Sequence, residues 1–283
     1  MPLFERVALF GVGLIGGSLS LDARRENLFG YVKASSRRRE SLEAALKRGI
    51  ADDITTDPVE CARDADLVVL AVPVMAMEDL AAKIAPSLGE KTIVTDVGSV
   101  KGDMVEKIEK TIPYSSMFVP AHPVAGSERY GPDAAVEGLF KDKWNIVTPT
   151  EKTNRESVDK IRALWEGVGM KVSEMDPHRH DKVLAAISHL PHVVAYALVD
   201  AVMRINNEDP ETVNLAAGGF HDYTRIAASS PEMWRDIFIM NSSSLRETID
   251  MFKTALDELT EMIKNSRGGE LEERLDEIRR FKK

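Results

Sequence analysis

Cysteine is almost absent from this 283-residue chain, in which Cys61 is the single example. One thiol can form neither an internal disulfide nor a clustered thiolate metal site. The residues around Cys61 predict that it packs as a small apolar side chain. The chain must therefore be stabilised by an ordinary hydrophobic core, which its length is sufficient to build.

Long apolar runs and a positive charge balance are lacking as well. No uninterrupted apolar run approaches the ~18 residues of a membrane-spanning helix, and the first strand-like segment follows Met1 too closely for a signal peptide. The net charge of −9 disfavours a nucleic-acid surface, because phosphate binding calls for a basic face. We therefore expect a cytoplasmic protein with no membrane and no nucleic-acid partner.

The composition that remains, 43% hydrophobic and 29% charged, is that of a globular protein, and the length suits two domains. Strand-like and helix-like segments alternate through the first two-thirds of the chain, with strand candidates at 7–10, 31–34, 67–72, 92–96, 117–119, 145–147 and 171–173. From Pro177 onward only helical periodicity continues. The sequence predicts a Rossmann-like, doubly wound parallel sheet in residues 1–176 and an all-helical domain in residues 177–283.

The last helical segment carries an apolar stripe made of Leu271, Leu275, Ile278 and Phe281. Such a stripe must pack against something. It could pack on its own domain or on a second copy of the chain. We expect a homodimer that assembles through the helical domain.

A glycine-rich turn at residues 11–16 lies between the first strand-like segment and the first helix-like one. Gly11 would permit the tight turn, Gly13 would let backbone N–H groups approach a pyrophosphate, and Gly16 would let helix and strand pack closely. An ordinary turn is the alternative. The strand-to-helix context favours a dinucleotide site, with Leu14 and Ile15 beside the cofactor.

Ligands of an open parallel sheet bind beyond the carboxyl ends of its strands. Val72 and Pro73 follow one strand and are expected near the cofactor, although Pro73 could simply end the strand. Asp96 and Ser99 follow the next strand, and Ser99 is favoured as the N-cap of the following helix, a position from which its hydroxyl could still face a ligand.

His122 lies between two prolines at another predicted strand end. The prolines restrict its backbone, and its position at a strand end points into the expected cleft. It could be a buried histidine with a structural hydrogen bond. It could equally be a general base, since histidine titrates near neutral pH.

The region after the second predicted strand bears on the choice of cofactor. An acidic residue about 20 positions beyond the glycine turn typically binds the ribose 2′-hydroxyl of NAD. Here Ser36 is followed by Arg37, Arg38 and Arg39, with no acid. These arginines could be a solvated start to the next helix, but they would also attract a 2′-phosphate. We favour NADP, with NAD possible.

Four ordered segments resemble the prephenate dehydrogenase family, which includes arogenate and cyclohexadienyl dehydrogenases of tyrosine biosynthesis. They are the stretches 96–101 (DVGSVK), 122–128 (HPVAGSE), 188–192 (SHLPH) and 220–227 (FHDYTRIA), and the resemblance covers nearly the whole chain. It implies oxidative decarboxylation of a cyclohexadiene that bears a C4 hydroxyl and a C1 carboxylate. The product would be 4-hydroxyphenylpyruvate from prephenate, or tyrosine from arogenate.

The resemblance also implies roles for individual residues. His122 would accept the C4 hydroxyl proton during hydride transfer to the nicotinamide, and Ser99 would orient His122 or the hydroxyl. Arg225 would hold a substrate carboxylate through its bidentate guanidinium. The remaining residues expected near the substrate are Ser188, His189, His192 and Trp234.

Other interpretations of these residues remain. Without the motif Arg225 would be assigned to the surface, and Trp234 to the core or an interface. His189 and His192, three residues apart, could suggest a metal site, but no cysteine or acid accompanies them, so we expect no metal.

Two other functions are disfavoured. A β-hydroxyacid dehydrogenase would need a lysine in a glycine-rich helical segment, which Lys182 does not have. A non-catalytic dinucleotide sensor would need neither base nor carboxylate clamp. The motifs do not decide between prephenate and arogenate. We expect no separate regulatory domain, although tyrosine could compete at the active site.

Overall fold

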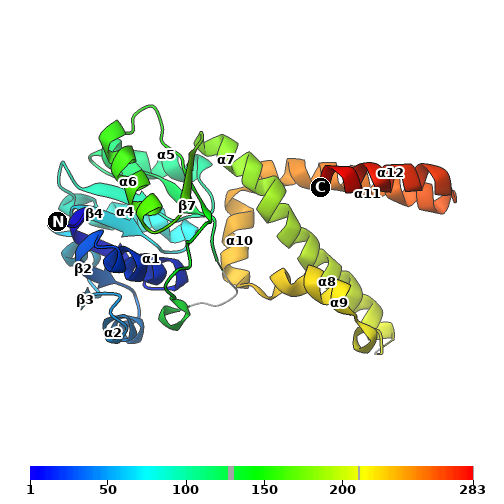
Figure 1. Ribbon diagram of the computed structural model, residues 1–283, viewed down its shortest axis with the longest axis horizontal. Coiled ribbons are helices and arrows are strands. Elements are labelled where there is room, and N and C mark those ends of the chain that lie inside the picture. Colours follow the sequence, from blue (N-terminus) through cyan, green and yellow to red (C-terminus); the bar gives the residue numbers. More distant parts are fainter. Residues whose placement is uncertain (127–130, 210, 283) are drawn as a thin grey trace.

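The computed structural model describes residues 1–126, 131–209 and 211–282. Its N-terminal part contains a six-stranded parallel sheet flanked by helices (Figure 1). In spatial order the strands are β3 (Asp53–Thr55), β2 (Phe29–Ser35), β1 (Phe4–Phe10), β4 (Leu67–Leu70), β5 (Ile93–Asp96) and β6 (Phe118–Val119). The helices are α1 (Leu14–Arg25), α2 (Arg39–Lys47), α3 (Pro58–Ala62), α4 (Met77–Ile84), α5 (Gly102–Thr111) and α6 (Arg155–Gly167).

Alternation along the central strands produces two cores. In β4, Leu67 and Val69 join the hydrophobic cluster on one face, and Val68 and Leu70 join the cluster on the other. Successive side chains of a strand point to opposite faces, so a fully apolar strand is buried between two helical layers. The predicted doubly wound sheet is confirmed, and Cys61 lies in the second cluster as expected.

The strand order reverses between β1 and β4, which is where such folds bind ligands. The glycine turn lies at this point. Gly11 has φ +95°, and a Cβ there would come within 2.1 Å of the Ala71 carbonyl oxygen. A Cβ on Gly16 would lie 2.2 Å from the Gly11 oxygen, so both positions require glycine.

Two details of the predicted sheet are wrong. Segments 145–147 and 171–173 do not extend it. They belong to a separate sheet of β7 (Ala121–Pro123), β8 (Trp144–Val147) and β9 (Lys171–Glu174), in which β7 and β8 are antiparallel. Pro120 separates β7 from β6 and accepts a hydrogen bond from the Thr148 N–H. The prediction also missed β3, whose three residues are too few to show a periodic pattern.

The C-terminal part is helical. It consists of α7 (Pro177–Leu184), a π-helical turn (Ala185–His189), α8 (Leu190–Glu208), α9 (Gly218–Thr224), α10 (Pro231–Met240), α11 (Ser242–Lys264) and α12 (Gly268–Lys282). Figure 1 shows two diverging arms, one of α8 and α9 and the other of α11 and α12, with α10 at their base. The helices at the base therefore lie against the sheet domain, and the arms extend away from it.

One helical stretch is longer and more apolar than the sequence analysis expected of any segment. Pro177–Glu208 contains an 18-residue window of mean hydropathy 1.5, which is 22% buried and is long and apolar enough to cross a membrane. Ser188, His189 and His192 interrupt the apolar sequence, so no uninterrupted run had suggested this. Core helices can pass the same test, which makes it weak evidence for a membrane.

Candidate active site

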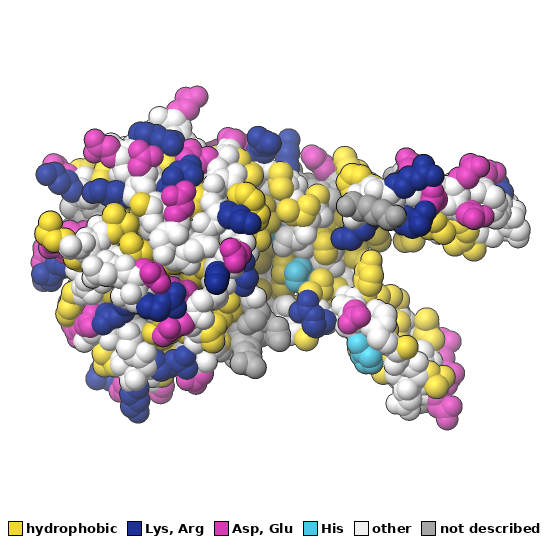
Figure 2. Space-filling model, in the orientation of Figure 1, with side chains coloured by type: hydrophobic (Ala, Val, Ile, Leu, Met, Phe, Trp, Pro, Cys, Tyr) yellow, Lys and Arg dark blue, Asp and Glu magenta, His cyan; other side chains and the backbone are white. Residues whose placement is uncertain are grey.

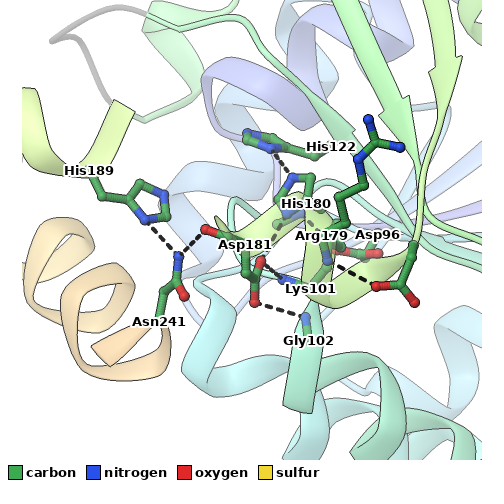
Figure 3. A network of polar contacts seen from close by, with 11 residues as sticks. Asp96, Lys101, Gly102, His122, Arg179, His180, Asp181, His189 and Asn241 are labelled. Carbon is green, nitrogen blue, oxygen red and sulfur yellow. Dashed lines mark hydrogen bonds and ion pairs between the residues drawn. The ribbon is translucent and has the colours of Figure 1, made fainter. Parts of the chain in front are cut away.

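His122 lies in β7, where it is 7% exposed and contacts the helical domain. Its Nδ1 is 2.8 Å from Nε2 of His180 in α7, and the other nitrogen of His180 is 2.8 Å from a carboxylate oxygen of Asp181 (Figure 3). The three side chains form a continuous hydrogen-bonded chain. The predicted base is thus linked to two groups that the sequence had not marked for any role.

Asp181 also binds the start of α5. Its two carboxylate oxygens accept the N–H groups of Lys101 at 2.8 Å and Gly102 at 2.9 Å. The prediction that Ser99 is the N-cap is wrong, because α5 begins at Gly102 and its first N–H groups are bound by a side chain from the other domain. A Cβ on Gly102 would lie 2.8 Å from Asp181 Oδ2, so glycine is needed for this approach.

Asp96 holds the backbone beside the base. Its carboxylate pairs with the buried ammonium of Lys101 and accepts the N–H groups of Gly98 at 2.7 Å and Ala121 at 3.2 Å. Burial lowers the pKa of Lys101, and the Asp96 carboxylate opposes that shift. Asp96 was expected at the cofactor, but both of its side-chain oxygens already accept these hydrogen bonds. A contact between Asp96 and a cofactor would therefore involve its backbone atoms.

Burial sets the protonation of the site histidines. The pKa of His122 lies well below its usual value, because of desolvation first and then electrostatic interactions with His180 and Lys101. Desolvation also lowers the pKa of His180, and lowers that of His189 to about 4. All three imidazoles are therefore neutral at neutral pH, and His122 is in the form that can accept a proton.

The predicted substrate histidines lie around Trp234. His192 stacks on the indole with a ring-centroid separation of 3.5 Å, and His189 meets its edge at 6.1 Å. The His192 Nδ1–H donates to the Ser188 carbonyl at 2.9 Å. Trp234 is buried, as its structural interpretation predicted, and it also fixes the ring of His192.

Asn241 connects this group to the base. Its amide nitrogen donates to the Asp181 carbonyl at 2.8 Å and to His189 Nδ1 at 3.1 Å (Figure 3). The hydrogen of His189 is therefore on Nε2. Within the described part of the chain, this Nε2–H and the Trp234 indole N–H are buried without a hydrogen-bond partner. Buried polar groups of this kind commonly await a ligand or water.

Arg225 lies at the start of the turn that follows α9 and is exposed in the single chain. Its positive charge contributes, after desolvation and the opposing Ser188 hydrogen bond, to the lowered pKa of His192. The structure therefore brings Arg225 near the histidine group. Ser127 and Glu128 of the HPVAGSE segment lie outside the described residues.

The glycine turn fits a dinucleotide pyrophosphate. No heavy atom would lie within 4 Å of a Cβ on Gly13, and α1 begins at Leu14 with no acid in its first turn. The first N–H groups of a helix lack intrahelical partners and attract anions. Leu14, Ile15, Ser36, Val72 and Ser99 are half-buried, whereas Arg37, Arg38 and Pro73 are exposed.

The sequence interpretation missed His180, Asp181, Asn241 and Lys101. The His180–Asp181 pair was visible but was considered only as the context of Lys182, which is exposed. Asn241 carries no local signal, because its partners lie 52 and 60 residues away. No cluster of three or more potential metal ligands occurs among the residues that the structure covers; absence of a metal stays a prediction.

A glycine turn at the switch point of a parallel sheet, together with a buried neutral histidine that contacts a helical domain, is typical of a nicotinamide-dinucleotide-dependent dehydrogenase. Comparison with known proteins agrees. The nucleotide-binding domain of prephenate dehydrogenase matches residues 19–174, and the dimerization domain of that family matches residues 176–277. The chain belongs to the prephenate dehydrogenase family.

Individual relatives are similar over almost their entire length. Cyclohexadienyl dehydrogenase of Zymomonas mobilis is 36% identical over 98% of this chain and 94% of its own. Prephenate dehydrogenase of Aquifex aeolicus, solved with hydroxyphenyl propionate and NAD⁺, has a TM-score of 0.93 and 37% identity, covering 98% of this chain and 97% of its own. Synechocystis arogenate dehydrogenase has a TM-score of 0.83 and 31% identity, covering 98% of both chains.

Proposed function

We propose that this protein catalyses the oxidative decarboxylation of prephenate, with arogenate as the alternative substrate, in tyrosine biosynthesis. The observation that carries the proposal is the neutral His122, which is held by His180 beside the strand ends where a dinucleotide would bind. Family membership supports the same reaction.

In this reaction His122 first acts as a base and then as an acid. It would take the proton of the C4 hydroxyl. A nicotinamide bound at the glycine turn would supply the acceptor for the hydride of C4. The ring ketone makes the C1 carboxylate a vinylogous β-keto acid, so the C1–carboxylate bond breaks and carbon dioxide leaves. The electrons of that bond aromatise the ring to a phenolate, which recovers the proton from His122. Proton uptake and release balance on one imidazole.

The helical domain would bind the substrate. Arg225 provides a fork for a carboxylate, and the Nε2–H of His189 and the indole N–H of Trp234 supply two donors beside the stacked His192. Ser188 holds the His192 ring through its carbonyl. Ser99 would orient the hydroxyl or the base. These are the roles that the sequence motifs imply.

The glycine turn, with Leu14 and Ile15, would hold the pyrophosphate, and Val72 and Pro73 would lie along the nicotinamide half. Arg37 and Arg38 are exposed, and no salt bridge involves either within the described residues. They are therefore available to a 2′-phosphate. On this ground NADP is favoured, and NAD, which is present in the Aquifex aeolicus structure, is the alternative.

The proposed domains are 1–176 for dinucleotide binding and 177–283 for substrate binding and dimerisation. Support comes from the end of β9 at Glu174 and the start of α7 at Pro177. A second copy of the chain would cover the exposed apolar side chains of α8, α11 and α12 in the proposed homodimer. A cytoplasmic location of this homodimer is part of the proposal.

The test is a nicotinamide absorbance assay that crosses prephenate and arogenate with NAD and NADP. Turnover in at least one combination is expected, with the greatest kcat/KM for NADP. Absence of turnover in all four combinations would refute the proposed reaction. Preference for a simple β-hydroxyacid would favour a β-hydroxyacid dehydrogenase. Dinucleotide binding with no turnover of any substrate would favour a non-catalytic dinucleotide sensor.

A further inference from the structure

The structure assigns to His180 and Asp181 the role of positioning residues for the base. We infer that they form a relay which fixes His122 in the tautomer with a hydrogen on Nδ1 and a lone pair on Nε2, and which stabilises His122 once it is protonated. The inference deepens the proposed function and rests on it for its kinetic consequences.

The tautomers follow from Asp181. Both of its carboxylate oxygens accept backbone N–H groups, at 2.8 Å and 2.9 Å, so the oxygen that faces His180 acts as an acceptor. The His180 nitrogen that faces it at 2.8 Å must then carry a hydrogen. Because burial lowers the pKa of His180, that ring is neutral, and its Nε2 can only accept. The His122 Nδ1, 2.8 Å away, is consequently the donor.

This arrangement leaves Nε2 of His122 as the nitrogen that takes the substrate proton. Protonation makes His122 an imidazolium whose Nδ1–H points at His180. The dipole of His180 and the charge of Asp181 lie in line behind it, so the positive charge is stabilised without a second proton transfer. A histidine base held by an acceptor that fixes its tautomer is a recurring arrangement in enzymes.

Asp181, the last residue of the relay, is held by hydrogen bonds to both domains, and this holds the relay in place. Asp181 lies in α7, but its carboxylate is bound to the start of α5 in the sheet domain, and its carbonyl accepts from Asn241. The other charged groups near His122 are Lys101 and Asp96, which form an ion pair. His189 is neutral and lies on the far side of Asn241. Docking of the helical domain therefore orients the base, since His180 and Asp181 come from that domain.

The kinetic test compares three variants. His180→Leu removes the acceptor, and we expect kcat to fall about 100-fold, within the usual range for an impaired general base, with substrate and cofactor KM changed less than about threefold. His180→Gln can place a carbonyl oxygen where Nε2 was, so it should recover at least about tenfold of that loss. His178→Leu, on the same helix but exposed, is the matched control and should behave as wild type.

The pH profile of kcat/KM adds a readout that a structural role would not move. His180 accepts the hydrogen bond from Nδ1 of protonated His122, so its loss should lower the pKa of His122 further: the acidic limb should move to lower pH in His180→Leu and stay in place in His178→Leu. An unchanged kcat and acidic limb in His180→Leu would overturn the relay. So would an equal loss of activity in the control.

A measurement without substrate separates the relay from the proposed reaction. The chain has six histidines, few enough for ¹⁵N-labelled imidazole spectra to be assigned by single substitutions. We expect hydrogen on Nδ1 for His122, His180 and His192, and on Nε2 for His189. If no substrate is turned over but these tautomers are found, the proposed reaction fails and the relay stands. Hydrogen on Nε2 of His122 in the wild type overturns the relay, whatever the activity.

Discussion

The two domains differ in how they hide their apolar side chains. The sheet domain encloses two large clusters of buried residues, one on each face of the sheet. From α8 onward, among the residues described, the buried side chains are Ala195, Trp234, Asp236, Ile237, Asn241 and Leu245. Large apolar side chains there lie in water, such as Met251 at 72% and Phe281 at 94% exposure.

Figure 2 shows the same contrast: hydrophobic side chains gather along the helical arms and at their base, whereas charged side chains are dispersed over the sheet domain. A sheet covered on both faces forms a core by itself, but two thin helical arms cannot. The sheet domain is therefore self-sufficient, and the helical domain depends on what covers it. The candidate active site lies where the two meet.

The largest expected effect on activity comes from replacing His122, the proposed base, which belongs to the sheet domain. Replacing His122 with Asn should lower kcat about 1000-fold, because no group remains to take the hydroxyl proton. Cofactor affinity should change little, since the glycine turn is untouched. Steady-state kinetics and a fluorescence titration with the dinucleotide measure the two quantities, with His178→Asn as the control. Full activity in His122→Asn would remove His122 as the base.

Acid should destabilise the protein through its buried histidines before its carboxylates titrate. His189 has a pKa of about 4 in the folded chain and about 6.5 when unfolded, so the unfolded state binds its proton first. Stability is complete above pH 6.5 and falls towards pH 4, by roughly 3 kcal/mol for this residue. Urea unfolding at pH 7 and pH 4.5 measures the loss. His189→Asn should lose less than wild type, and exposed His221→Asn should match it; equal losses in all three would refute the assignment.

Arg225 tests the substrate-binding role of the helical domain. Arg225→Ala should raise the substrate KM about 30-fold, because a charged hydrogen bond to the carboxylate is lost. The cofactor KM should stay constant, since the sheet domain binds the cofactor. Arg204→Ala, on exposed α8, provides the control. An unchanged substrate KM would place Arg225 outside the site.

A charge on the exposed face of α11 tests whether a second copy covers it. Met251→Glu should weaken dimerisation about tenfold or more, because an apolar contact would be replaced by a buried charge. Sedimentation equilibrium measures the dissociation constant. Leu46→Glu places the same charge on a partly exposed apolar position of the sheet domain and should have no effect. A monomeric wild type would contradict the comparison between the domains.

The smallest effect concerns cofactor choice. Arg38→Ala should raise the KM for NADP about three- to tenfold and leave that for NAD unchanged, because an exposed arginine contributes modestly to phosphate binding. Arg39→Ala serves as a comparison, because Arg39 already pairs with Glu43. An equal effect on both cofactors would argue against a 2′-phosphate contact.

Much of the fold could be predicted because its signals are local. The apolar run of β4, the glycines at 11 and 16 and the loss of strand pattern after Pro177 each reflect a requirement met within a few residues. The separate sheet of β7, β8 and β9 could not be predicted, since strand pairing is decided by partners distant in the chain. The prediction that Ser99 caps α5 was wrong for the same reason, because the carboxylate that binds the first N–H groups of α5 comes from Asp181 in the other domain.

The sequence by itself determined the fold class and the glycine turn, because each depends on local sterics and on periodicity, and it singled out His122 and Arg225 through the motifs that contain them. Only the tertiary structure decided that His180 and Asp181 lie behind His122, that Asn241 joins His189 to Asp181, and that burial keeps these imidazoles neutral. Tautomer and pKa depend on neighbours and solvent exclusion, and these exist only after the helical domain has packed against the sheet domain.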